Sequence, residues 1–209
     1  MDVDPMARTT AAEPLETALS AAERAAKSAR SIVLVEGPSD RAALEALAER
    51  QGKDLAAEGI SVVPIGGATN IAHFIEVLVP YDVRLAGLCD VAEERFFRFG
   101  LERTGVGAAT SREQRETLGF FACIDDMEDE LIRALGPPAV EAVMDAEGEL
   151  ASYRLFQQQP AQRERTATQQ LHRFMGTRSM RKIRYGRLLV EALDMHRVPR
   201  PLEAVLAVA

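Results

Sequence analysis

The sequence has little cysteine and no apolar run long enough to cross a membrane. Its two cysteines, Cys89 and Cys123, each end an apolar run. Two isolated cysteines form neither a disulfide framework nor a zinc site, so we expect both to be reduced and structural. The amino-terminal residues begin acidic and resemble neither a signal nor a transit peptide, and no stretch approaches the roughly 20 apolar residues of a spanning helix. We therefore expect a cytoplasmic protein without a membrane partner.

Nucleotide-binding and histidine metal motifs are also missing. Gly66 and Gly67 form a turn before an expected helix, but neither GxxxxGK[ST] nor GxGxxG occurs, so a nucleotide-binding P-loop is not supported. The three histidines, His73, His172 and His196, are far apart and show no metal-ligand spacing, so we expect structural or surface roles for them. The 209 residues, 47% of them hydrophobic, suffice for one globular domain of ordinary size with a small helical appendage.

Charge is distributed unevenly along the chain. The net charge is −7, yet the residues from Ala151 onward include eleven basic and four acidic ones, a net charge of +7, which leaves −14 for the residues before them. An acidic site flanked by a basic surface would give this asymmetry, and so would solvated helix faces with an uneven arginine distribution.

Four short apolar runs alternate with helical patterns. The runs are SIVLVEG (31–37), ISVVPIGG (60–67), VRLAGLCD (83–90) and LGFFACID (118–125), and helical patterns occupy 15–29, the segment after Pro38, 70–79, 93–101 and most of the chain after Gly136. Apolar runs without polar alternation are typical of strands buried on both faces, and alternation with helices predicts parallel pairing. The sequence therefore predicts an α/β fold with a mostly parallel four-stranded sheet. We divide it into an N-terminal helix or extension (1–30), an α/β core (31–136) and a helical C-terminal region with a basic segment (137–209).

Acidic residues follow three of the predicted strands. They are Glu36 and Asp40 after the first, Asp90 with Glu93 and Glu94 after the third, and Asp126 and Glu128 after the fourth. Ligands of open α/β sheets bind outside the carboxyl ends of the strands, and hard cations such as Mg²⁺ take carboxylate oxygens. The pattern therefore predicts a metal site, although individual acids could instead occupy a helix first turn or a solvated helix face.

Four segments together resemble the TOPRIM domain, a Rossmann-like α/β fold, of overcoming-lysogenization-defect (OLD) nucleases. They are VEGPSDRAAL, GGATNI, the LCD strand end and IDDMEDELIRALG, and the resemblance extends from Ser31 to Leu193. It implies that Glu36 and Asp40 bind metal, that Asp90 is the first acid of an Asp-x-Asp pair, and that Asp126 and Glu128 are the later acidic pair. The second acid of the Asp-x-Asp pair is replaced by Ala92. Either Glu93 or Glu94 substitutes for it, the second metal site is weakened, or catalysis is lost.

The resemblance also implies a lysine near the site, matched by Lys182. This residue lies in a segment, from Arg173 to Arg187, with six basic residues, no acidic one, and Phe174 and Tyr185 interleaved. Such a segment can neutralise backbone phosphates, and a lysine in the site can stabilise charge on phosphoryl oxygens. It could equally be the basic face of a helix.

Our first hypothesis is a Mg²⁺- or Mn²⁺-dependent endonuclease in which Glu36 and Lys182 are catalytic and five acids bind metal, namely Glu36, Asp40, Asp90, Asp126 and Glu128. Nucleic acid is the expected partner, with DNA favoured over RNA, and a homodimer is compatible with the sequence. OLD nucleases carry an ATPase domain before the TOPRIM domain, so ATP control would require a separate ATPase subunit. The alternative is a catalytically degenerate TOPRIM module that binds nucleic acid or an ATPase partner. A weaker third option is another flavodoxin-like fold with Mg²⁺ at its acidic strand ends.

Overall fold

The fold is built on four parallel strands. The computed structural model describes residues 5–108 and 110–209, with side chains from Leu15 onward. The strands are β1 (Ser31–Val35), β2 (Ile60–Pro64), β3 (Arg84–Asp90) and β4 (Phe120–Cys123), and they lie in the order β2-β1-β3-β4. Every neighbouring pair is parallel. The four strands lie within the four predicted runs, and the predicted α/β fold is confirmed.

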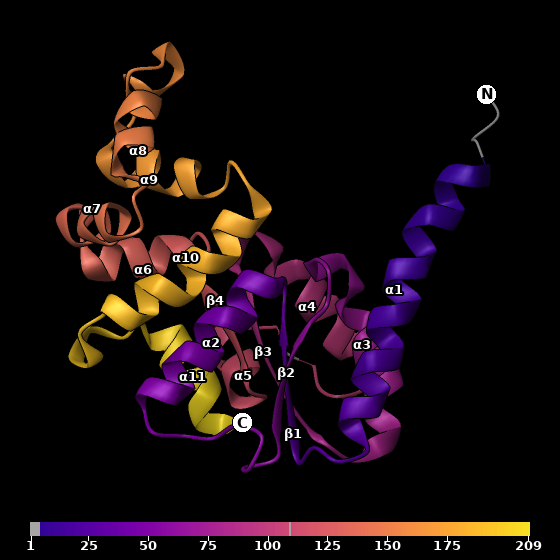
Figure 1. Cartoon of the computed structure of the whole chain (residues 1–209). Coiled ribbons are helices and arrows are strands. Elements are labelled where there is room, and N and C mark those ends of the chain that lie inside the picture. Colours follow the sequence, from indigo (N-terminus) through magenta and orange to yellow (C-terminus); the bar gives the residue numbers. More distant parts are fainter. Residues whose placement is uncertain (1–4, 109) are drawn as a thin grey trace.

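Helices flank the sheet and make up most of the rest of the chain (Figure 1). They are α1 (Pro5–Ala26), α2 (Pro38–Arg50), α3 (Ile71–Leu78), α4 (Glu94–Arg103), α5 (Arg112–Thr117), α6 (Met127–Leu135), α7 (Pro137–Ala146), α8 (Leu150–Gln157), α9 (Ala167–Met175), α10 (Ser179–Ala192) and α11 (Arg200–Val208). Short 3-10 turns are η1 (Ala68–Asn70), η2 (Val79–Tyr81), η3 (Val91–Glu93), η4 (Pro160–Gln162) and η5 (Met195–Arg197). Helix α5 was not predicted; Ser111 begins it by accepting a hydrogen bond from the backbone N–H of Gln114.

Each face of the sheet has its own apolar core because successive side chains of a strand point in opposite directions. Ile32 and Leu34 of β1 belong to the core shared with α1, α3 and α4. Val33 and Val35 belong to the core on the other face, to which α2, α6, α7, α9, α10 and α11 contribute. Both faces of the central strand are therefore buried, which explains its unbroken apolar sequence.

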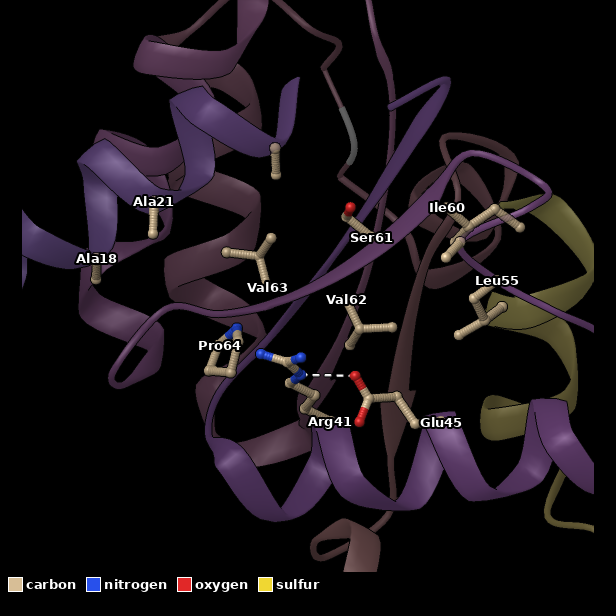
Figure 2. Close-up of a pocket in the computed structure, with 12 residues that line it drawn as sticks. Ala18, Ala21, Arg41, Glu45, Leu55, Ile60, Ser61, Val62, Val63 and Pro64 are labelled. Atoms are coloured by element: carbon tan, nitrogen blue, oxygen red, sulfur yellow. Dashed lines mark hydrogen bonds and ion pairs between the residues drawn. The ribbon is translucent and has the colours of Figure 1, made fainter. Parts of the chain in front are cut away.

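Strand β2 forms one edge of the sheet, and a recess of about 500 Å³ runs along it between α1 and α2 (Figure 2). The ion pair of Arg41 and Glu45, with 2.7 Å between Nε and Oε1, lies at this recess. Pro64 has no backbone N–H, which limits pairing of this edge with another strand. The recess contains none of the predicted site residues. In the described part of the chain, no helix combines the length and apolarity needed to cross a membrane.

Helix α10 packs closely against α2. A Cβ atom added to Gly186 of α10 would lie 2.7 Å from the carbonyl oxygen of Ser39 in α2. The absence of a side chain at Gly186 therefore allows the two helices to pack with their backbones almost in contact. This packing positions α10, which carries Lys182, beside the start of α2, which carries Asp40.

We expect Gly186→Ala to destabilise the protein by about 1–3 kcal/mol, because the added methyl group must displace backbone and not a movable side chain. Urea unfolding monitored by circular dichroism measures this free energy. Gly176→Ala is the matched control, since its nearest atoms would lie at 3.7 Å and its backbone φ of −72° suits alanine. Equal stability of the Gly186 and Gly176 variants would contradict the packing argument.

Candidate metal centre

The carboxyl ends of β1, β3 and β4 surround a small acidic cavity. Its volume is about 160 Å³, and it is lined by Glu36, Gly37, Ser39, Asp40, Gly67, Asp90, Asp126, Glu128 and Lys182. All six residues predicted to form the site therefore line one cavity, although they come from positions as far apart as 36 and 182. We call it the acidic cavity.

Three carboxylates form the tightest acidic group around this cavity. One oxygen each of Glu36, Asp90 and Glu93 lies within 4.8 Å of the others. The backbone N–H of Asp90 donates to Glu36 Oε1 at 2.9 Å, which fixes the orientation of the Glu36 carboxylate. Glu94 instead forms an ion pair with Arg115, with 2.8 Å between Oε2 and Nη2. Of the two acids that follow Ala92, Glu93 is thus the one that points toward Glu36 and Asp90.

The other predicted acids are held by helix amino termini. Asp40, in the first turn of α2, accepts the backbone N–H of Gly37 through Oδ2 at 2.8 Å. Asp126 precedes α6 and accepts the backbone N–H of Asp129 through Oδ1 at 2.8 Å. Its second oxygen, Oδ2, lies 2.5 Å from Nε2 of His172, in α9. Helix amino termini favour negative charge, which offsets part of the cost of burying these two carboxylates.

Lys182 is the basic residue that pairs with Glu128 in the acidic cavity. Its Nζ lies 3.2 Å from Oε2 of Glu128, whose carboxylate is almost completely buried. Most other basic residues of its segment are paired elsewhere: Arg181 and Arg184 with Glu149, and Arg187 with Glu49 and Glu191. The interleaved aromatic residues, Phe174 and Tyr185, are buried in the core. Of the predicted basic segment, Lys182 is therefore the residue that lines the acidic cavity.

Burial raises the pKa of four of the acids, Glu36, Asp40, Asp90 and Glu128. Burial raises the pKa of Glu36 to about 9, with further contributions from a hydrogen bond with Glu93 and the charge of Asp90. It raises the pKa of Asp90 to about 8, helped by the charges of Asp126 and Asp40. The pKa of Asp40 rises to about 7 through burial and the charge of Glu128. Without a cation, these carboxylates repel one another and retain protons near neutral pH.

The His172 contact has the opposite effect on Asp126. Burial opposes ionisation of Asp126, but the hydrogen bonds from His172 and from the backbone N–H of Asp129 outweigh it and lower the pKa of this carboxyl. The same hydrogen bond raises the pKa of His172. For Lys182, burial lowers the pKa, but the charge and hydrogen bond of Glu128 together with the charges of Asp126 and Asp40 outweigh it, and the net shift is upward. Asp126 and Lys182 therefore both favour their charged forms.

Sequence reasoning did not select His172, and it left Glu93 and Glu94 as equal alternatives. His172 lies 46 positions from Asp126, and nothing in a single sequence indicates that the two side chains meet. The other two histidines, His73 and His196, are exposed. The choice of Glu93 depends on the 3-10 turn η3, which turns the chain directly after Asp90.

The residues around the acidic cavity fit a hard divalent cation. The group of Glu36, Asp90 and Glu93 offers only carboxylate oxygens, which Mg²⁺ and Mn²⁺ prefer. Oxygen Oε2 of Glu93 is buried without a hydrogen-bond partner among the described residues. A buried carboxylate oxygen of this kind is costly unless it has a partner, and a cation would supply one.

Comparison with known proteins relates this site to a family. Residues 29–91 match the family described as "Overcoming lysogenization defect protein-like, TOPRIM domain", and this range includes Glu36, Asp40 and Asp90. The C-terminal region of the Xanthomonas campestris pv. campestris OLD protein has a similar structure, with 22% identity, a TM-score of 0.64, and coverage of 86% of this chain and 93% of that one. The C-terminal region of the Burkholderia pseudomallei OLD protein is also similar, with 22% identity, a TM-score of 0.65, and coverage of 87% of this chain and 99% of that one. A comparison with curated proteins finds no match.

The raised pKa of Glu36 predicts how stability depends on pH in the metal-free protein. Folded Glu36 titrates at about 9 and its ordinary pKa is 4.5, so the unfolded chain releases this proton first. Between about pH 5 and pH 9, rising pH should therefore reduce the free energy of unfolding. Glu36→Gln should reduce this loss, and urea unfolding in EDTA at several pH values measures it.

The control for this experiment is Glu102→Gln, an exposed glutamate that should retain the pH dependence of the parent. Added Mn²⁺ should raise the thermal midpoint of the parent at about pH 8 more than that of Glu36→Gln, because bound cation stabilises only the folded state. Identical pH slopes in parent and Glu36→Gln would contradict the assigned shift.

Proposed function

We propose that the chain is a Mg²⁺- or Mn²⁺-dependent nuclease that hydrolyses phosphodiester bonds of DNA, because residues 29–91 match the OLD-like TOPRIM domain. The observation that supports this most is the convergence of carboxylates and one lysine at a single cavity beyond the strand ends. This donor set suits a cation and a phosphate together, since carboxylates hold the cation and an ammonium group faces the phosphate oxygens.

In this proposal, Glu36, Asp90 and Glu93 hold one cation. Glu93 thereby replaces the carboxylate that is missing at Ala92. Asp40, Asp126 and Glu128 line the rest of the acidic cavity and are the proposed ligands on that side. When bound, the cation would acidify water and offset charge on the phosphate. His172 would keep Asp126 ionised and correctly oriented through its 2.5 Å hydrogen bond.

The reaction is the addition of water across a phosphodiester bond. The water oxygen bonds to phosphorus, the bond from phosphorus to the leaving sugar oxygen breaks, and the leaving oxygen gains a proton. Glu36 is the proposed acceptor of the water proton. Lys182 would donate hydrogen bonds to the non-bridging oxygens, where charge accumulates in the transition state. Its place 3.2 Å from Glu128 keeps the ammonium group charged and directed at the cavity.

Supercoiled plasmid incubated with Mn²⁺ or Mg²⁺ tests the proposal. The parent should nick it, and Glu36→Gln, Glu93→Gln and Lys182→Ala should each reduce the rate by roughly 100-fold or more, the usual loss for a group that stabilises the transition state. Glu102→Gln and Lys27→Ala, which change exposed residues away from the acidic cavity, should nick at the parental rate. Full activity of Glu93→Gln would contradict its assignment as a ligand.

The second candidate is a catalytically degenerate TOPRIM module that binds nucleic acid or an ATPase partner. Ala92 favours it, because this position lacks the second acid of the Asp-x-Asp pair. In the same assay, an inactive parent that still binds Mn²⁺ would support this candidate. Nicking gained only on Ala92→Asp would identify the missing carboxylate as the cause.

A further inference from the structure

A second recess opens beside the acidic cavity, on the side of α9. Its volume is about 320 Å³, and it is lined by Asp125, Asp129, Arg165, Gln169, His172 and Arg173. The last four recur at intervals of four, three and one positions, which places them on one face of α9 and of the turn before it. We call it the α9 recess.

The α9 recess and the acidic cavity share a boundary. His172 lines the recess, and its Nε2 lies 2.5 Å from Oδ2 of Asp126, which lines the acidic cavity. An extended ligand that has one group in the acidic cavity could therefore place its next group in the α9 recess. The recess lies between α9, with the turn before it, and the start of α6. Helix α9 lies beside α8, above the sheet in Figure 1.

The arginines of the α9 recess differ from most others in this region because they lack acidic partners. Arg173 has no ion pair among the described residues, and Arg165 donates through Nε to the carbonyl oxygen of Ala161 at 3.1 Å. By contrast, the arginines of α10 pair with glutamates.

Two carboxylates also line the α9 recess. Asp129 lies 2.6 Å from Nε of Arg133, which also pairs with the neighbouring Glu130 at 3.0 Å. Asp125 is exposed and has no ion pair among the described residues. Arg165 and Arg173 are therefore the basic groups of the recess that lack an acidic partner, and they lie beside a strongly acidic cavity. Two such guanidinium groups suit a ligand with several anionic groups, of which one binds through a cation.

We infer that the α9 recess binds a backbone phosphate of the nucleic acid next to the phosphodiester held in the acidic cavity. This inference rests on the proposed function and names the substrate contact that the acidic cavity cannot provide. Guanidinium groups bind phosphate oxygens through paired hydrogen bonds, and the Gln169 amide can donate another. Such contacts read no base edges, so recognition in the recess is independent of sequence.

Fluorescence anisotropy of a short fluorescein-labelled DNA duplex, and of its single strand, tests the recess in Ca²⁺ without Mg²⁺ or Mn²⁺. The Arg165→Ala/Arg173→Ala double variant should bind roughly 10-fold more weakly at low salt, since charged hydrogen bonds are lost. The slope of log K against log salt should shrink by about 0.9 for each duplex phosphate contact removed. Arg30→Ala is the control, because Arg30 is exposed and directly precedes β1, at the end of the strand opposite to the acidic cavity.

Three results would overturn the inference: parental affinity and salt slope in the double variant, an equal loss in Arg30→Ala, or no DNA binding by the parent. Hydrolysis of bis(p-nitrophenyl) phosphate by the parent with Mn²⁺ tests the proposed function separately from phosphate binding in the recess. That small diester carries one phosphate and reports on the acidic cavity alone. A parent that hydrolyses neither this compound nor plasmid contradicts the nuclease, while the anisotropy still decides the recess.

Discussion

All four strands run in the same direction, so the residues that follow β1, β3 and β4 meet at the carboxyl end of the sheet. Carboxylates gather at this end of the sheet and repel one another, and the surrounding structure must offset that repulsion. Backbone N–H groups at the starts of α2 and α6 orient Asp40 and Asp126. Side chains of later helices, His172 and Lys182, supply positive charge. Burial, together with the repulsion that remains, raises the pKa values of Glu36 and Asp90.

The two cores of the protein support the carboxyl end of the sheet in different ways. The core that includes α1, α3 and α4 supports the sheet from one side and contributes Glu93 through the turn before α4. The other core brings α9 and α10 over the strand ends. The near contact of Gly186 with Ser39 helps to position α10, which carries Lys182. The helical part after the sheet is therefore a structural component of the acidic cavity.

Much of the fold and part of the site could be predicted from the sequence. Apolar runs identified the strands because β1 and β3 are buried on both faces. The acids that follow the strands could be placed together at the carboxyl end of the sheet from parallel topology alone. The order of the strands, the pairing of His172 with Asp126 and the choice of Glu93 over Glu94 could not be predicted. Each depends on contacts between distant segments or on the direction of a single turn, which local patterns do not encode.

The contact between α2 and α10 joins segments separated by about 140 positions, as the hydrogen bond from Arg50 to the carbonyl oxygen of Val190 illustrates. Closing so long a loop slows folding more than it lowers final stability. A partly folded chain can complete β1 and β2 with α2 between them long before α10 docks. Glu36 and Asp40 belong to the segment that contains β1 and α2, whereas Lys182 belongs to α10, so the full constellation exists only when α10 is docked.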